Sequence, residues 1–422
     1  MKKYVIIGAC AAGLAAAEQI RKTDKNGEIT VLTNEAYLPY SRPSISYLLK
    51  GAVKESDMFL RKTQFYKTNK INIITDSKVT AIDRDNKKVK AGKKEYAYDK
   101  LCICTGSKPF IPPMKNVEGR ENAYTFLDLA AAKAVKAAAD KNTRAVVIGA
   151  GLIGMKAAEG LSKICKSVDV VELAPRILPS ILDAKSSKNV KKYIEEHGHI
   201  KFHLENTVVS AKTKGKRIIA VVLRDGREIK CDMVVMAVGV RPETQLAEQA
   251  GLEVNRGIIT NPATMQTSDE NIYAAGDCTV SVDMLDGANK IIALWPNAVQ
   301  QGTAAGSQMA GGNLAIDGTY SVNAIDFYGL RICTCGLINA VGEQYSDKIS
   351  QNADEYKRLV FEDSRLVGFV LINSSTNAGI YTKLIADKAD LRTLSGDIMD
   401  TPSLFMFDRQ TRTQKLTGGL AL

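Results

Sequence analysis

The stretch YVIIGACAAGLAAAEQI at residues 4–20 decides the fold, and AVVIGAGLIGMKAAEGL at residues 145–161 repeats its pattern. Each copy begins with an apolar run that predicts a buried parallel strand, continues through closely spaced glycines, and ends in a helical run. Glycines in this order allow a tight turn and a close approach of the backbone to a pyrophosphate, which the free N–H groups of the helix then bind. The sequence therefore predicts two dinucleotide sites.

Each copy is followed by an acidic residue that ends a second apolar strand. Glu35 ends ITVLTNE and lies 22 residues after Gly13, and Glu172 ends VDVVE and lies 18 residues after Gly154. A spacing of about 20 residues is typical of the βαβ unit that binds dinucleotides, in which this carboxylate accepts the adenosine ribose hydroxyls. Two complete units argue against a chance match.

The two copies differ at the middle glycine. The second copy has a full glycine set, whereas the first has Cys10 at the position where the smallest side chain is expected. We interpret Cys10 as a tolerated small residue in preference to a redox-active thiol. The predicted binding residues of the two turns are Gly8, Ala9, Cys10, Ala12, Gly13, Gly149, Gly151, Leu152, Ile153 and Gly154.

Length and charge set further limits. A chain of 422 residues with 45% hydrophobic and 24% charged side chains predicts a globular protein of several domains. Because long apolar runs are missing and Met-Lys-Lys leads directly into a strand, we expect no membrane span and no signal peptide, and we predict a cytoplasmic protein. The net charge of +11 favours acidic partners, or else reflects a solvated, lysine-rich surface. No arginine cluster is interleaved with aromatic residues, so nucleic acid is not expected as a partner.

Cysteines and histidines predict no metal site. The eight cysteines include no C-x-x-C pair and lie mostly in apolar runs, which is typical of reduced, buried thiols. His197, His199 and His203 all fall in EEHGHIKFHLE, where a helix is expected to end and a strand to begin, so their side chains should be spread over different faces. Chemistry that needs no histidine is therefore favoured, and hydride transfer to a flavin is of that kind.

Three further motifs accompany the two fingerprints: YDKLCICTGSKP at 98–109, MAVGVRPE at 236–243 and IYAAGDC at 272–278. With them the chain resembles the FAD-dependent pyridine nucleotide oxidoreductases over nearly all of its length. PYSRPSISYLLKG at 39–51 and ALWPNAVQQG at 293–302 are most similar to the branch of NADH:rubredoxin reductases, ferredoxin-linked reductases and nitrite reductase flavoproteins. The resemblance implies FAD at the first fingerprint and NADH at the second.

The same resemblance implies the fold class: α/β, with two Rossmann-like three-layer domains as in glutathione reductase and a small α+β C-terminal domain as in rubredoxin reductases. We expect an FAD-binding domain from residues 1–113 and 240–320, an NAD-binding domain over 114–239, the small domain over 321–405 and a polar tail over 406–422. Both a homo-oligomer and a hetero-oligomer stay open.

Further site residues are implied by the resemblance. Asp277 is expected to bind the ribityl chain of FAD, and Trp295 either contacts the flavin or packs in the core. The complete set outside the two turns is Glu35, Arg42, Pro43, Val79, Thr105, Gly106, Lys108, Asp277, Trp295 and Pro296 for FAD, and Glu172, Arg176 and Gly239 for NADH. Glu172 favours NADH over NADPH because it would repel a 2′-phosphate, although the nearby Arg176 weakens this preference.

The loop that carries redox cysteines in the disulfide reductases and NADH oxidases of this superfamily lacks them here. Residues 36–52 contain Ser41, Ser44 and Ser46 but no cysteine. Related ferredoxin reductases also pair a lysine and a glutamate beside the flavin, at the positions of Tyr47 and Lys156. Lys156 either places positive charge near the flavin or forms a structural ion pair with Glu159, and we name both as candidate catalytic residues.

These features predict an enzyme that passes electrons between NADH and an acidic one-electron iron–sulfur carrier, rubredoxin or ferredoxin, through FAD. The direction of flow is left open, as is membership of a larger redox complex. Two alternatives remain: an NADH oxidase, peroxidase or disulfide or polysulfide reductase, and a non-catalytic flavoprotein that serves as an assembly subunit.

Overall fold

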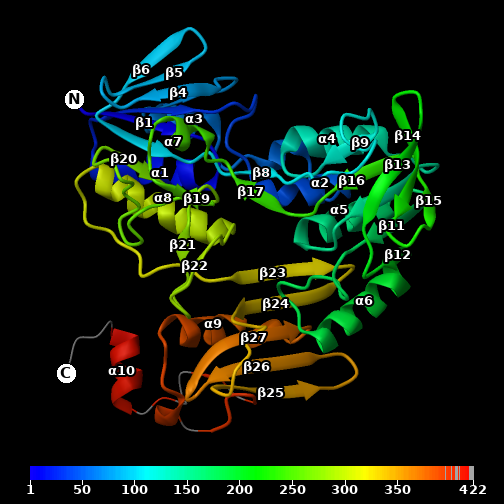
Figure 1. Ribbon diagram of the computed structural model, residues 1–422. Coiled ribbons are helices and arrows are strands. Elements are labelled where there is room, and N and C mark those ends of the chain that lie inside the picture. Colours follow the sequence, from blue (N-terminus) through cyan, green and yellow to red (C-terminus); the bar gives the residue numbers. More distant parts are fainter. Residues whose placement is uncertain (395, 401, 404–406, 408, 418–422) are drawn as a thin grey trace. The chain divides into compact units, whose positions relative to one another are not determined.

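The computed structural model describes residues 1–394, 396–400, 402–403, 407 and 409–417 (Figure 1). The chain forms two compact units, one from Met1–Leu173 with Lys201–Tyr320 and the other from Ala174–Ile200 with Ser321–Leu422. Both fingerprints lie in the first unit. The division of that unit into FAD-binding and NAD-binding domains stays a prediction. Among the described residues, no helix is long and apolar enough to cross a membrane.

The first fingerprint builds a five-stranded sheet in the order β20-β7-β1-β2-β3, in which every neighbouring pair is parallel. Its strands are β1 (Lys3–Ile7), β2 (Glu28–Leu32), β3 (Ile71–Ile74), β7 (Lys100–Ile103) and β20 (Ile272–Ala274). They are largely apolar because both faces of the sheet are covered. Helix α1 (Ala11–Thr23) runs beside α8 (Trp295–Met309) in Figure 1, so closely that a Cβ at Gly302 would lie 2.2 Å from the Ala12 oxygen.

The second fingerprint builds an equivalent sheet in the order β12-β11-β10-β16-β9. Its central strand is parallel to both neighbours. The strands are β9 (Ala123–Thr125), β10 (Arg144–Ile148), β11 (Ser167–Val171), β12 (Ile200–His203) and β16 (Met233–Met236), and the helices between them are α4 (Leu129–Ala138) and α5 (Leu152–Ser162). Two parallel sheets with crossover helices confirm the predicted Rossmann-like α/β class.

Smaller antiparallel sheets accompany each parallel sheet. One has the order β4-β5-β6 and the other β13-β14-β15. Their strands are β4 (Val79–Asp83), β5 (Lys88–Ala91), β6 (Lys94–Ala97), β13 (Val208–Lys214), β14 (Arg217–Leu223) and β15 (Glu228–Lys230). The Asp225-Gly226 pair within RIIAVVLRDGREIKCD is a sequence typical of a hairpin turn, and the structure confirms it: β14 and β15 pair across the turn and Gly226 has φ +88°.

Short elements connect these sheets. The motifs at 98–109 and 236–243 each contain a short strand near their end, and these two strands pair antiparallel with each other. The connecting elements are η1 (Arg42–Ser44), α2 (Ile45–Leu49), η2 (Glu55–Met58), α3 (Thr63–Thr68), β8 (Ser107–Pro109), β17 (Val240–Pro242), α7 (Gln245–Gln249), β18 (Val254–Asn255), β19 (Gly257–Ile258), β21 (Ser281–Val282) and β22 (Asn289–Lys290).

The second unit is the α+β module that the sequence predicts after Ser321, joined by α6 (Ala184–Gly198). Its sheet has the antiparallel order β23-β24-β27-β26-β25. The elements are β23 (Val322–Phe327), β24 (Leu330–Gly336), β25 (Tyr345–Gln351), β26 (Tyr356–Glu362), β27 (Arg365–Ile372), η3 (Ser375–Asn377), α9 (Ala378–Ala386), η4 (Leu391–Thr393) and α10 (Arg409–Thr417). Residues 406, 408 and 418–422 of the predicted tail lie outside the described residues.

The structure confirms the expected placement of the histidines and cysteines. His197 lies in α6, His199 follows it with φ +51°, and His203 lies in β12. All eight cysteines are free of disulfides. Cys102 in β7 and Cys104 just after it lie with their sulfurs 3.4 Å apart. The described residues include no group of three or more His, Cys, Asp or Glu placed to hold a metal ion.

Candidate functional site

The first glycine-rich turn depends on two contacts that only glycine permits. Gly8 follows β1 with φ +107°, and a Cβ there would lie 2.0 Å from the carbonyl oxygen of Cys104. A Cβ at Gly13 would lie 1.9 Å from the Gly8 oxygen. The start of α1 therefore lies directly against the end of the sheet. Because no side-chain cap hydrogen bond is made at Cys10, the N-cap residue of α1, the helix presents its first N–H groups for a pyrophosphate.

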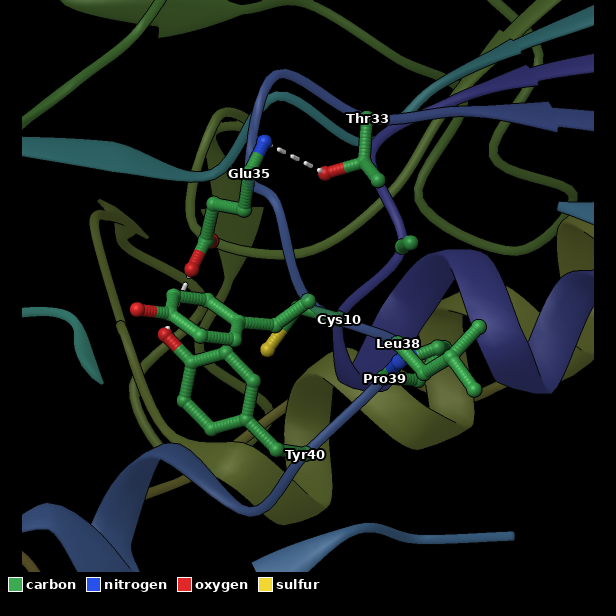
Figure 2. A pocket seen from close by; sticks show the side chains of 8 residues that line it. Cys10, Thr33, Glu35, Leu38, Pro39 and Tyr40 are labelled. Carbon is green, nitrogen blue, oxygen red and sulfur yellow. Dashed lines mark hydrogen bonds between the residues drawn. The ribbon is translucent and has the colours of Figure 1, made fainter. Parts of the chain in front are cut away.

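Glu35 is oriented by two side chains from the segment that follows it. The Tyr40 hydroxyl donates to Glu35 Oε2 at 2.6 Å, and the Arg42 guanidinium pairs with Glu35 Oε1. The Leu129 N–H donates to the Tyr40 oxygen at 2.9 Å. Figure 2 shows the Glu35 carboxylate directed toward the Tyr40 hydroxyl in a pocket that Cys10 also lines. The predicted ribose-binding carboxylate is therefore held in a fixed orientation.

Cys10 fits this pocket as a small, uncharged side chain. Its backbone angles, φ −96° and ψ −154°, are ones that any residue can adopt, which explains why a glycine is not required there. Burial raises the pKa of the Cys10 thiol, and the positive charge of Arg42 acts in the opposite direction. A protonated thiol is a weak nucleophile, so the geometry supports the interpretation of Cys10 as a packing residue.

Asp277 lies after β20 and close to the loop that follows β7. Ser107 Oγ donates to Asp277 Oδ2 at 3.1 Å. Burial raises the pKa of the Asp277 carboxyl, and the hydrogen bond from Ser107 opposes that shift. A buried carboxylate that accepts one hydroxyl keeps lone pairs for another donor, so Asp277 suits the hydroxyls of a ribityl chain.

The loop after β7 also binds the chain segment that follows β17. Thr105 Oγ1 donates to the Glu243 carbonyl oxygen at 2.6 Å, and Lys108 Nζ lies 3.1 Å from Glu243 Oε2. Gly106 has φ +70°, with no heavy atom within 4 Å of the position of a Cβ. Thr105 and Lys108 thus have structural partners, and their predicted contacts with FAD stay predictions.

The remaining residues predicted for FAD lie at separate places in the first unit. Trp295 and Pro296 begin α8, where Trp295 packs against the core of the first sheet and Pro296 is exposed. Val79 is buried at the start of β4, and Pro43 is exposed in η1. Core packing explains the position of Val79, and it agrees with the interpretation of Trp295 as a core residue. Their contacts with FAD are not tested by the fold.

The second glycine-rich turn repeats the first. Gly149 has φ +103°, and a Cβ there would lie 2.4 Å from the Ala237 oxygen. A Cβ at Gly154 would lie 2.0 Å from the Gly149 oxygen, whereas one at Gly151 would meet no heavy atom within 4 Å. Leu152 and Ile153, which begin α5, are half-buried. The open space at Gly151 suits the close approach of a phosphate.

The acidic residue of the second site binds its own glycine-rich turn. Glu172 Oε2 accepts a hydrogen bond from the Ala150 N–H at 2.6 Å. Arg176 belongs to the second unit, where its Nη2 donates to Asn339 Oδ1 at 3.4 Å. Gly239, with φ +110°, follows the strand β16. Glu172 is thus next to the turn, and the weakening influence predicted for Arg176 is untested.

Lys156 and Glu159 form the ion pair that one interpretation of the sequence expects. Lys156 Nζ lies 2.5 Å from Glu159 Oε2 on α5. Lys50, the residue after α2, places its Nζ 3.4 Å from Glu159 Oε1. The Tyr47 ring has both ammonium groups near its face, with Lys50 Nζ 4.5 Å and Lys156 Nζ 5.2 Å from the ring centroid. This cluster joins the segment after the first site to the helix of the second.

Two of these contacts were missed in the sequence. Tyr40 binds Glu35 from five residues away, across a loop whose path no periodicity predicts. Lys50 contacts Glu159 over 109 residues. The only signal for Lys50 is its position three residues after Tyr47, about one helical turn along the same face.

The two sites together identify the family. A family model described as pyridine nucleotide-disulphide oxidoreductase matches residues 2–302. The chain belongs to this family. It is an NADH-dependent flavoprotein oxidoreductase with FAD as its cofactor. The glycine turns, the open helix N-termini and the buried Asp277 carboxylate fit two dinucleotides.

Several characterised proteins are similar to this oxidoreductase in sequence. An NADH oxidase of Methanocaldococcus jannaschii is 38% identical, over 73% of this chain and 70% of that protein. A rubredoxin-NAD(+) reductase of Pseudomonas putida is 32% identical, over 73% and 80%. The epsilon subunit of an NADH-dependent phenylglyoxylate dehydrogenase of Aromatoleum evansii is 28% identical, over 95% of each chain.

Two solved structures share the fold over nearly the whole chain. A ferredoxin reductase of Rhodopseudomonas palustris has a TM-score of 0.86 and 25% identity, over 96% of this chain and 100% of that one. A NAD-dependent persulfide reductase of A. fulgidus has a TM-score of 0.85 and 27% identity, over 99% and 84%. By contrast, this chain spans about half, 48%, of a similar nitrite reductase of Bacillus subtilis.

Proposed function

We propose that this oxidoreductase passes electrons between NADH and a one-electron iron–sulfur carrier protein of the rubredoxin or ferredoxin type. When bound, FAD supplies the step between a two-electron and a one-electron partner. The similarity to a rubredoxin-NAD(+) reductase and to a ferredoxin reductase supports this class of partner. The direction of electron flow is not part of the proposal.

The observation that carries the proposal is the segment between the two nucleotide sites. Residues 36–52 run from the first site to α5 of the second, where a Cβ at Gly160 would lie 2.8 Å from Leu49. Ser44 Oγ donates to Ser41 Oγ at 2.9 Å in this segment, which contains no cysteine. A serine hydroxyl cannot form a disulfide or a persulfide. The absence of cysteine supports direct transfer of electrons from the flavin to an external acceptor, without a thiol of this segment as an intermediate.

The chain's own residues would divide the work between binding and orientation. We assign Gly8, Gly13, Glu35 and Asp277 to FAD, with Tyr40 and Arg42 holding Glu35. NADH would be bound by the turn from Gly149 to Gly154 and by the Glu172 carboxylate. This carboxylate can accept a hydrogen bond from the 2′-hydroxyl of the adenosine ribose. Lys156, at the start of α5, would provide positive charge between the two sites.

Charge supports an acidic carrier. The net charge of +11 would speed encounter with an acidic iron–sulfur protein more than it would tighten the complex. We also propose a cytoplasmic location, which the eight cysteines without disulfides fit.

Two other functions have specific support. The 38% identity to an NADH oxidase favours oxygen as acceptor, and the similarity to a persulfide reductase favours sulfur chemistry, but the absence of cysteine from 36–52 argues against a thiol in that segment for either. The match along 95% of a dehydrogenase subunit favours work within a larger complex.

The test is an anaerobic titration followed by a comparison of acceptors. Purified protein loaded with FAD is mixed with NADH, and the flavin absorbance is followed; we expect rapid bleaching. Rubredoxin, ferredoxin, nitrite, oxygen and a disulfide are then supplied separately at equal concentration. Turnover with an iron–sulfur protein well above that with oxygen or disulfide supports the proposal. Turnover with oxygen alone would replace it with the oxidase, and no bleaching would favour the non-catalytic subunit.

A further inference from the structure

The cluster formed by Tyr47, Lys50, Lys156 and Glu159 brings two lysines to one buried glutamate. Glu159 is 1% exposed, whereas the side chains of Lys50 and Lys156 are 11% and 13% exposed. Each carboxylate oxygen of Glu159 pairs with a different lysine, Oε1 with Lys50 and Oε2 with Lys156. A carboxylate removed from water in this way needs cationic partners.

The two lysines come from different parts of the first unit. Lys156 is three residues before Glu159 on α5, so the two would meet in any helix of this sequence. Lys50 follows α2, eight residues after Arg42, which holds Glu35 in the first nucleotide site. The cluster therefore links Lys50, which lies on the segment that follows the first nucleotide site, to α5, the helix that begins at the second site.

Sharing one carboxylate changes the charge that Lys156 presents. The three side chains Lys50, Lys156 and Glu159 carry one formal negative and two formal positive charges. Removal of Lys50 would take one positive charge from the cluster and would leave Lys156 paired with the same Glu159 carboxylate. The Tyr47 ring lies within cation–π distance of both ammonium groups and keeps each of them in the cluster.

We propose that Lys50 is a positioning residue, which takes up part of the Glu159 charge so that Lys156 acts as a cation on the flavin side of the cluster. The inference rests on the proposed function, in which Lys156 provides positive charge between the two nucleotide sites. A nearby positive charge stabilises the anionic reduced form of a flavin relative to its neutral oxidised form. Lys50 is thus expected to raise the flavin midpoint potential.

The experiment measures the midpoint potential of the FAD-loaded full-length protein and of the variants K50M, K50Q and K50R. In K50M and K50Q we expect the midpoint potential to fall by about 30 mV. For a two-electron couple, this shift corresponds to a roughly tenfold rise in the ratio of oxidised to reduced flavin at a fixed solution potential. In K50R the cation is kept, so the potential should stay within a third of that shift.

Lys136 supplies the matched control. Its Nζ donates to the Leu48 carbonyl oxygen at 2.9 Å, so it contacts α2 from α4 but does not touch Glu159. K136M should lower the melting temperature of the apoprotein without moving the flavin potential. K50M should lower the melting temperature and should also lower the flavin midpoint potential.

Two results would overturn the inference: an unchanged potential in both K50M and K50Q, or an equal shift in K136M. The proposed function fails separately, if no iron–sulfur protein accepts electrons. A shifted potential in an enzyme that reduces only oxygen would keep the role of Lys50 and reject the carrier.

Discussion

The two nucleotide sites have the same turn but hold their acidic residues differently. In the first site, Glu35 is fixed by Tyr40 and Arg42 from a following segment, in a pocket that Cys10 also lines. In the second site, Glu172 accepts from Ala150 of its own glycine-rich turn. The first carboxylate is oriented by two side chains that lie five and seven residues further along the chain, whereas the second accepts a main-chain N–H from 22 residues before it.

This difference suits a resident cofactor and an exchanging one. A carboxylate held by two side chains needs little reorganisation to bind a ribose, which favours tight binding. The Glu172 carboxylate accepts a main-chain N–H at one oxygen and can still accept a hydrogen bond from a ribose hydroxyl. We expect FAD to stay bound at the first site and NADH to bind and leave at the second.

The largest expected effect separates the two sites by their turns. In Gly13→Ala the new Cβ would lie 1.9 Å from the Gly8 oxygen, which should cost about 3 kcal/mol or more and release FAD. In Gly154→Ala the overlap with Gly149 is similar, but we expect retention of FAD and loss of NADH binding. Flavin absorbance after purification and calorimetric NADH binding measure the two losses.

Gly151→Ala is the control for this comparison. Its Cβ would meet no heavy atom within 4 Å, so the protein should fold and keep FAD while NADH binds more weakly. Equal loss of FAD in Gly13→Ala and Gly154→Ala would show that the two turns are not assigned to different nucleotides.

The second prediction concerns the buried carboxylate of the first site. Asp277→Asn should weaken FAD binding by roughly 10- to 100-fold, because a hydrogen bond to a charged group contributes about 1.5–3 kcal/mol. The binding constant is measured by titrating the apoprotein with FAD. Ser107→Ala, which removes the Ser107 hydroxyl at 3.1 Å but keeps the charge, should have a smaller effect.

The same variant predicts a pH dependence of stability. Burial raises the pKa of Asp277, so folding of the apoprotein shifts the protonation equilibrium of this carboxyl toward its neutral form. This contribution to stability is complete below the unfolded pKa of about 3.9 and is lost as the pH rises through the folded value. In denaturant unfolding, the free energy of unfolding of Asp277→Asn should rise relative to that of the native apoprotein as the pH rises from the unfolded pKa of Asp277 through its folded pKa. A constant difference from pH 4 to 8 would contradict it.

The third prediction tests the second site through its specificity. Glu172→Ser or Glu172→Arg should shift the ratio of kcat/KM for NADPH over NADH upward by roughly tenfold, about 1.4 kcal/mol. Asp169→Asn is the control, since Asp169 lies on β11, the strand that Glu172 follows, but pairs with His203 at 2.8 Å. An unchanged preference in the Glu172 variants would remove Glu172 from the ribose site.

The smallest effect is expected where the two turns differ in sequence. Cys10→Gly makes the first turn match the second, and the residue adopts ordinary backbone angles, so stability should fall by less than about 1 kcal/mol through backbone entropy. FAD affinity and thiol reactivity measure the result. Loss of turnover in Cys10→Ser, with FAD still bound, would restore a redox role for Cys10.

Much of the fold could be predicted from local patterns. The buried strands, the hairpin at Asp225-Gly226 and the small α+β module were all expected, since each follows from periodicity or turn chemistry within about 20 residues. The acids Glu35 and Glu172 were found by their spacing alone. Their partners were not, because Tyr40 reaches Glu35 through an irregular loop and not through a regular element.

The sequence by itself determined that this protein has two dinucleotide turns, which acid follows each turn, and that residues 36–52 contain no thiol, because these features depend on residue identity and short spacing. Only the tertiary structure decided which charges meet. Lys50 and Glu159 are 109 residues apart, and whether Lys156 forms a helical ion pair or shares its carboxylate depends on how α2 packs against α5. Interactions between exposed charges are largely screened beyond about 10 Å at 0.1 M salt, so which side chains interact is set by packing that no local pattern contains.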